Sequence, residues 1–167
     1  MDFMLSNEQR MLQKLAAQFA ENELEPMAAE LDETHCFPVE NFQKMARLGF
    51  TGIGVPKEYG GVGGGAVEEV LVVTEFAKKC MSSAATLSIH LIVPHLLTQF
   101  GTEEQKRTYL PRITAGGEVA AFALTEPNAG SDAGSAKTTA IFDSETNEYV
   151  LNGTKCFITG GSGPASW

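Results

Sequence analysis

The sequence predicts an α+β fold, in which a helical region is followed by the beginning of an antiparallel β region. Apolar residues recur at helical spacing through the first two thirds of the 167 residues. The pattern changes near Gly116-Gly117, and beyond it short apolar runs alternate with turn residues. We therefore assign residues 1–118 to a helical N-terminal domain and residues 119–167 to the start of a β domain.

The helical region opens with a capping signal. Ser6 is followed three residues later by Gln9, which is the spacing of a capping box. Residues 11–19 then carry apolar side chains at helical spacing. Pro26 and Pro38 are each suited to the first turn of a further helix, where the missing N–H costs nothing.

The middle of this region alternates helices with one long break. Gly49 is placed to end the third helix, and residues 49–65 are rich in glycine. Helical spacing resumes over residues 66–79 and again over 82–100, where Pro94 predicts a kink or an interruption. A second capping box, formed by Thr102 and Gln105, opens the last helix.

The β region is predicted from short apolar runs and turn signals. Residues 119–124 are typical of a buried strand, residues 138–142 alternate weakly, and residues 144–147 indicate a turn. Asn152-Gly153 predicts a hairpin between strands at 149–151 and 156–159. Four strands with open edges make a poor independent unit, so we expect the sequence to end part-way through its second domain.

Charge and cysteine content narrow the possible functions. The chain has 12 basic and 21 acidic side chains, a net charge of −9, which argues against a nucleic-acid partner. Its three cysteines, Cys36, Cys80 and Cys156, fit neither a disulfide framework nor a metal-ligand pattern. A reducing compartment follows, either the bacterial cytoplasm or, in a eukaryote, the mitochondrial matrix.

The sequence also argues against secretion and a membrane span. Residues 1–6 carry no basic n-region and no long apolar run. No stretch is judged long and apolar enough to cross a bilayer, because His90, Pro94 and His95 interrupt the apolar run at 89–97.

The strongest functional signal lies in residues 122–135, which turn through small residues after the apolar run. Small residues let backbone N–H groups approach a ligand closely, and the hydroxyls of Thr125, Ser131 and Ser135 add donors. This arrangement suits a flat cofactor that carries phosphate groups. Composition alone leaves an ordinary strand and turn equally open.

Residues 123–132, Ala-Leu-Thr-Glu-Pro-Asn-Ala-Gly-Ser-Asp, resemble the signature of the acyl-CoA dehydrogenase family. Residues 149–161 resemble a second family stretch, and residues 5–9, 52–61 and 100–106 match the N-terminal part of the family. Members have a helical N-terminal domain, a β-barrel middle domain and a helical C-terminal domain. The resemblance therefore implies that the β region is an incomplete antiparallel barrel.

The resemblance implies FAD as the cofactor and two segments that hold it. Thr125 would hydrogen-bond the pyrimidine edge of the flavin, Thr159 would donate to the ring, and Ser131 would also contact the substrate. Phe157 stands where tryptophan is commoner, which keeps an aromatic face without the indole N–H. The implied cofactor-binding residues are Phe122, Ala123, Leu124, Thr125, Gly130, Ser131, Phe157, Ile158 and Thr159.

The implied reaction is α,β-dehydrogenation of an acyl-CoA thioester, in which a carboxylate removes the α-proton and the β-hydride passes to the flavin. In the family that base is a glutamate of the C-terminal domain, and no residue here matches it. We therefore assign no catalytic residue and expect the 167-residue chain alone to be inactive. The implied partners are an electron-transfer flavoprotein and further copies of the chain in a homotetramer.

Two other functions remain open from the sequence. One is a flavin-dependent oxidase or hydroxylase on the same scaffold, and the other is a binding module without enzymatic activity. A loose dinucleotide fingerprint at residues 61–66 is weak, because no strand precedes it and no acidic residue follows about 20 positions later. We interpret it as a flexible loop at a helix start.

Several chemically suggestive residues have simpler interpretations. His90 and His95 lie in an apolar helix, where a histidine is most often a packing residue. Glu126 is predicted to be structural, as is Asp132, because the resemblance gives neither the role of the base. Tyr149 and Lys155 are interpreted as surface or strand-edge residues.

Overall fold

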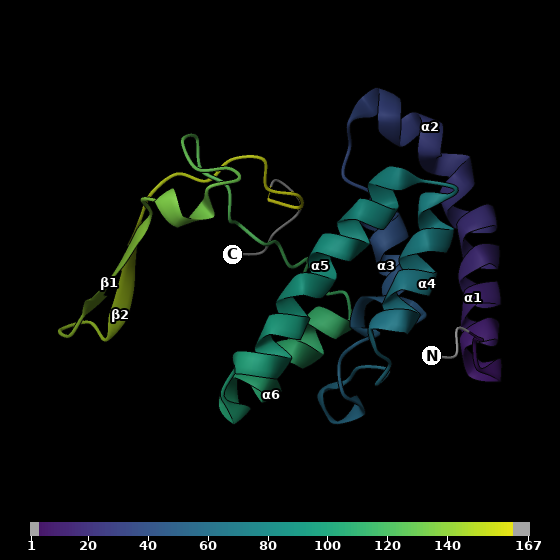
Figure 1. Cartoon of the computed structure of the whole chain (residues 1–167), viewed down its shortest axis with the longest axis horizontal. Helices are drawn as coiled ribbons and strands as arrows, with labels where there is room; N and C mark the ends of the chain where they lie inside the picture. The colour runs from purple at the N-terminus through teal and green to yellow at the C-terminus, as the bar shows by residue number, and fades with distance from the viewer. Residues whose placement is uncertain (1–3, 162–167) are drawn as a thin grey trace.

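The computed structural model describes residues 4–161, in which a helical body is followed by an extended segment and a β-hairpin (Figure 1). This arrangement confirms the predicted α+β class. The helices are α1 (Asn7–Phe19), α2 (Glu25–Thr34), α3 (Val39–Arg47), α4 (Ala66–Ala77), α5 (Met81–Phe100) and α6 (Glu103–Thr114). The strands are β1 (Thr139–Asp143) and β2 (Glu148–Asn152), and short helical turns lie at Ala20–Leu24, Phe50–Gly52, Lys57–Tyr59 and Ala133–Ser135.

Both predicted capping boxes are present. The Ser6 hydroxyl accepts from the Gln9 amide at 3.1 Å, and the Gln9 side chain accepts from the Ser6 amide at 2.9 Å. Thr102 and Gln105 make the same pair of bonds at the start of α6. Pro26 lies in the first turn of α2, but α1 continues into α2 through a π-helical turn.

Helix α5 differs from the sequence prediction in two ways. It runs without interruption through Pro94, which rules out the interruption that was one of the two outcomes expected there. At 20 residues it is also long and apolar enough to cross a membrane. By length and composition, the prediction that no stretch of the sequence could do so is therefore wrong. The helix contacts α2, α3, α4 and α6, and 39% of its apolar window is buried inside the fold.

The core lies between the helices of the body. Phe19, Phe50 and Phe76 form an aromatic cluster with ring centroids 5.1 to 5.5 Å apart, and each is at most 7% exposed. Such buried aromatic pairs contribute both apolar burial and favourable ring geometry. The cluster joins α1 and α4 to the glycine-rich segment that follows α3.

The β region contains two described strands, not the four that were predicted. β1 and β2 pair in antiparallel register from Thr139↔Asn152 to Asp143↔Glu148, with the turn at residues 144–147 as expected. The segments 119–124 and 156–159 are not strands, because neither has a neighbour that completes a hydrogen-bonded ladder.

The hairpin predicted at Asn152-Gly153 is therefore wrong. Asn147, with φ of 59°, takes the left-handed position of the actual hairpin turn. Gly153 serves a different purpose, since a Cβ there would lie 2.2 Å from the Thr138 hydroxyl oxygen. Its glycine permits a close approach of two backbones rather than a tight turn.

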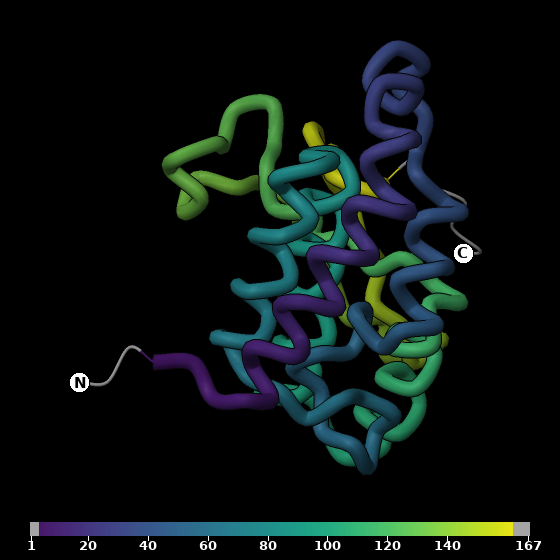
Figure 2. The backbone as a smooth tube through the Cα atoms, turned by 90° about the vertical axis from the view of Figure 1, so that its right-hand side faces the viewer, coloured from purple at the N-terminus to yellow at the C-terminus, as the bar shows by residue number. Residues whose placement is uncertain are grey.

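The hairpin stands away from the helical body (Figure 1), and every residue of β2 is exposed. Figure 2 is viewed from the helical side, and the last, yellow-coloured part of the chain lies behind the helices. The position of the hairpin relative to the helical body therefore depends on the segment that leads from α6 to β1.

Candidate functional site

The two segments implied by the sequence as cofactor-binding lie next to each other. The Cys156 amide donates to the Thr125 carbonyl at 2.9 Å, and the Lys155 ammonium donates to the Leu124 carbonyl at 3.0 Å. These bonds join residues that are about 30 positions apart in the chain. The site is thus assembled from the end of the segment that leaves the helical body and the segment that follows β2.

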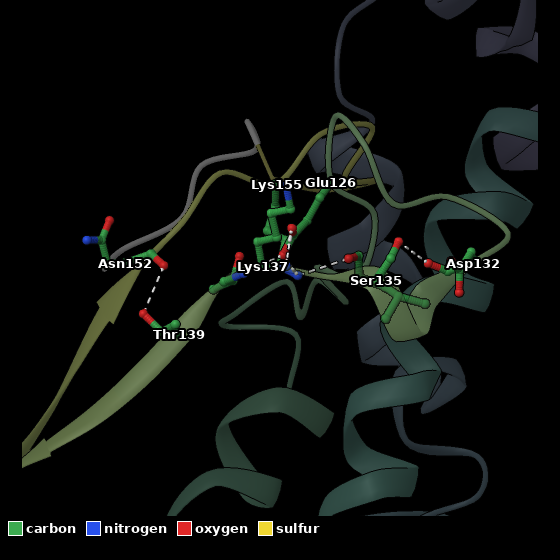
Figure 3. A network of polar contacts seen from close by, with 9 residues as sticks. Glu126, Asp132, Ser135, Lys137, Thr139, Asn152 and Lys155 are labelled. Carbon is green, nitrogen blue, oxygen red and sulfur yellow. Dashed lines mark hydrogen bonds and ion pairs between the residues drawn. The ribbon is translucent and has the colours of Figure 1, made fainter.

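Glu126 ties these segments together (Figure 3). Its carboxylate accepts from the backbone amides of Lys137 at 2.7 Å and Thr138 at 3.0 Å, and from the Lys155 ammonium at 2.9 Å. Its own backbone pairs with Ala129 in both directions, at 3.0 and 3.1 Å, which closes the turn. We call Glu126 and Lys155 the carboxylate clamp.

The clamp keeps Glu126 ionised. Its side chain is 7% exposed, and the amide of Lys137, the Thr138 residue and the Lys155 ammonium hold the pKa of the carboxyl far below its ordinary value of 4.5. A carboxylate whose lone pairs are already occupied is a poor general base near neutral pH. The geometry therefore agrees with the structural role predicted for Glu126.

Lys155 was interpreted from the sequence as a surface or strand-edge residue, and that interpretation is wrong. Its side chain is 25% exposed and bonds both the Glu126 carboxylate and the Leu124 carbonyl. No local pattern links two residues 29 positions apart, apart from their opposite charges. Tyr149, by contrast, is an exposed residue of β2, as expected.

Beside the joined segments lies a cavity of about 400 Å³. This volume is within the range of small-molecule sites. Its lining combines small residues with apolar and polar side chains: Ala121, Ala123, Lys155, Cys156, Phe157, Ile158 and Gly161. The cavity therefore offers both apolar and polar groups to a small molecule.

Large apolar side chains are exposed on the same segments. Phe157 is 93% exposed and has a left-handed backbone, with φ of 57°. Phe122 is 38% exposed and Leu124 is 45% exposed. Apolar groups left open next to a cavity are the groups that a bound ring would cover.

The remaining predicted cofactor residues are distributed over these two segments. Thr125 and Ile158 are half-buried, whereas Ala123 and Thr159 are exposed. Gly130 and Ser131 lie beyond the turn in an open loop, where a Cβ at residue 130 would meet nothing within 4 Å. The structure thus brings the 122–125 and 157–159 sets together and leaves 130–131 at the outer edge.

The dinucleotide fingerprint at residues 61–66 has no support in the fold. A short 3-10 turn at Lys57–Tyr59 precedes it, not a strand. Gly61 is required by packing, since a Cβ there would lie 2.1 Å from the Val55 carbonyl oxygen. The glycines therefore serve the tight loop before α4 rather than a phosphate site.

Family models for "Acyl-CoA dehydrogenase, N-terminal domain" and "Acyl-CoA dehydrogenase, middle domain" match residues 6–117 and 121–167. The chain is 70% identical over 161 residues to "Acryloyl-CoA reductase (NADH)" of Anaerotignum propionicum, covering 96% of this chain and 41% of that protein. The chain therefore spans about two fifths of the length of this relative.

Two solved structures resemble the chain closely. One is described as "Electron transferring flavoprotein of Acidaminococcus fermentans: Towards a mechanism of flavin-based electron bifurcation" (TM-score 0.90, 42% identity, 98% of this chain and 43% of that chain). The other is an acyl-CoA dehydrogenase complexed with FAD from Bacillus anthracis (TM-score 0.84, 41% identity, 92% and 27%). With both family models matching over nearly the whole length, the chain belongs to the acyl-CoA dehydrogenase family.

Proposed function

We propose that this chain forms part of the FAD and acyl-CoA site of a flavoenzyme that catalyses α,β-dehydrogenation of an acyl-CoA thioester. The observation that carries the proposal is the junction of residues 122–125 with 157–159 beside the 400 Å³ cavity. Family membership and the FAD complex of the Bacillus anthracis relative support the cofactor assignment.

When bound, FAD supplies a two-electron acceptor for hydride. The Thr125 and Thr159 hydroxyls and the neighbouring backbone amides would hold its polar edge, while Phe122 and Phe157 would cover its ring. Donors at the pyrimidine edge favour the reduced cofactor, because negative charge gathers there. Ser131 is proposed to contact the acyl-CoA at the outer edge of the site.

The proposed partners follow from the same family membership. Electrons are proposed to pass to an electron-transfer flavoprotein, and the Acidaminococcus structure supports such a partner by its description. A homotetramer and a location in the bacterial cytoplasm, or in the mitochondrial matrix of a eukaryote, are proposals from the sequence.

A second candidate function is the reverse reaction, reduction of a short α,β-unsaturated acyl-CoA. The observation that favours it is the 70% identity to the acryloyl-CoA reductase of Anaerotignum propionicum. The two candidates share the cofactor and the carbon atoms that react, and they differ in which substrate is consumed. A three-carbon acyl-CoA is the first substrate to test in either direction.

The test uses the natural polypeptide that carries this sequence, after its intact mass has been measured under denaturing conditions. Under anaerobic conditions, propionyl-CoA should bleach its oxidised flavin if it is a dehydrogenase. Acryloyl-CoA should restore the colour of the chemically reduced protein in either case, since a catalyst works in both directions, and sustained turnover of acryloyl-CoA with NADH would identify the reductase. A protein that lacks FAD, or whose flavin responds to no acyl-CoA in either direction, contradicts the proposal. Rapid reoxidation by air alone would instead favour the oxidase.

A further inference from the structure

His90 is a fully buried histidine that the proposed reaction does not use. It lies in α5 with no exposed surface, and its ring packs edge-on against Phe42 at a centroid distance of 4.8 Å. Both ring nitrogens have partners: Nδ1 accepts from the Ala120 amide at 3.0 Å, and Nε2 lies 3.3 Å from the Thr51 carbonyl. The ring therefore needs the neutral tautomer with its proton on Nε2.

These hydrogen bonds fix the position of the segment from Thr114 to Ala120, through which the chain leaves the helical body. The buried Thr51 hydroxyl donates to the carbonyl of Thr114, the last residue of α6, at 2.7 Å. Thr51 and His90 therefore anchor both ends of the connection from Thr114 to Ala120. Within this connection Gly116, with φ of 70°, packs so closely on Ala46 that a Cβ would lie 2.2 Å away.

Ala120 lies two residues before Phe122, the first residue proposed to face the flavin. The Ala120–His90 bond is the one side-chain hydrogen bond found, in the described part of the chain, between α5 and the segment 119–125. If Ala120 were displaced, Phe122 and the residues that follow it would be displaced with it, because only one residue lies between them. A displacement of about 1 Å in a site is enough to matter for a bound reactant.

We propose that His90 is a positioning residue: by accepting the Ala120 amide it sets where the cofactor segment leaves the helical body. The part of this proposal that concerns FAD rests on the proposed function. The part that concerns the segment stands on the geometry alone. His90 itself is too deeply buried in the helical body to be assigned a direct cofactor contact.

The role belongs to the neutral ring. Protonation would turn Nδ1 into a donor facing the Ala120 N–H, and the bond would be lost. The described partners of the ring, namely Phe42, Thr51 and Ala120, are all uncharged, and the hydrogen bond to the Thr51 carbonyl, which favours the imidazolium, is outweighed by the burial of the ring. Burial accordingly lowers the pKa of His90 to about 4.

Two substitutions distinguish a role of His90 in holding the Ala120 amide from a role in which its side chain only fills space in the core. His90→Asn keeps an acceptor near the Nδ1 position and loses the donor to Thr51, whereas His90→Gln keeps a donor near Nε2 and loses the acceptor for Ala120. Both remove the ring, and Asn is one methylene smaller than Gln, so the loss of volume alone would perturb His90→Asn more than His90→Gln, which is the opposite of the order expected from positioning. Amide hydrogen exchange of Ala120, with amides of α1 and α4 as references, reports the contact in each variant.

The expected result is that Ala120 exchanges on the order of tenfold faster in His90→Gln, while His90→Asn stays close to the wild-type rate. FAD affinity, measured by titration, should fall in the same order, by about tenfold in His90→Gln. Equal Ala120 exchange in the two variants would overturn the proposal. A selective change at Ala120 that leaves FAD affinity unchanged would overturn the part of the proposal that concerns FAD.

If the natural polypeptide that carries this sequence fails to bind FAD, the proposed function is contradicted, whereas the exchange rates still decide whether His90 holds the segment. The imidazole ¹⁵N chemical shifts provide a second readout that is independent of both flavin and folding stability. The proposal requires the Nε2–H tautomer at neutral pH. An Nδ1–H tautomer would overturn it, because that nitrogen could not accept the Ala120 amide.

Discussion

The helical body and the segment 119–161 are held together by different forces. The body buries a continuous apolar core, including Phe50, Phe76 and Leu87, each at most 1% exposed. Between residues 119 and 161 only Glu126 and Ala129 are buried. Hydrophobic burial therefore stabilises the first region, whereas a few directed polar contacts position the second and leave its apolar side chains exposed.

The largest expected loss of stability follows from a substitution in the core of the helical body, whereas a comparable substitution in the hairpin should cost little. Phe76→Ala should lower the free energy of unfolding by about 3–5 kcal/mol, because it empties the centre of the aromatic cluster. Phe142→Ala is the matched control, since Phe142 is 50% exposed on β1, and it should cost less than about 1 kcal/mol. Denaturant unfolding followed by circular dichroism measures both, and equal losses would contradict the comparison.

The next effect concerns pH and the buried His90. Its pKa falls from an ordinary value of 6.5 to about 4 on folding, so the unfolded chain binds the proton more readily. The contribution to stability is complete above pH 6.5 and is lost as the pH falls from 6.5 to 4, by roughly 3 kcal/mol in total. Denaturant unfolding across this window measures it. His90→Asn should remove the part of the slope due to this group, and an unchanged slope would contradict the assignment.

A smaller effect tests the connection between the two regions. Gly116→Ala should cost about 1–3 kcal/mol, since it forces a left-handed residue and places a methyl group against Ala46. Gly117→Ala is the adjacent control, because its nearest neighbour would be an ordinary contact 3.7 Å away at the Arg112 carbonyl. Thermal unfolding of both variants distinguishes them, and similar melting temperatures would show that the close packing is not required.

The smallest effect on global stability comes from the carboxylate clamp. Lys155→Met should leave the unfolding midpoint of the helical body unchanged, because the contacts that it removes lie wholly within the second region. The amides of Lys137, Thr138 and Cys156 should exchange faster, and FAD should bind on the order of tenfold more weakly. Lys137→Met is the control, since Lys137 contributes its backbone amide to Glu126. Equal effects of the two substitutions would contradict the clamp.

The sequence predicted the helical body better than it predicted the segment 119–161. The caps at Ser6 and Thr102 were predictable because they depend on residues three positions apart. The strands at 119–124 and 156–159 were not, because an apolar run becomes a strand only where a neighbour completes its hydrogen bonds. The continuity of α5 through Pro94 likewise reflects its packing against surrounding helices rather than local propensity.

For the candidate site, the resemblance implied both segments, and it gave no indication of the contacts that join them. The contact between Glu126 and Lys155 spans 29 positions and has no sequence pattern. The role of His90 is equally invisible in the sequence, since a histidine on an apolar helix gives no indication of its partners. Short-range sequence signals therefore predict which residues are candidates for the site, whereas their hydrogen-bond partners depend on tertiary contacts that the sequence does not reveal.

The most direct test of the central claim is to map FAD onto the natural polypeptide that carries this sequence, by NMR chemical-shift changes of the backbone amides. The account predicts changes concentrated in residues 122–125 and 156–159, with the amides of residues 61–66 unaffected. Changes centred on the glycine-rich loop at 61–66, or no changes in either segment at saturating FAD, would contradict it.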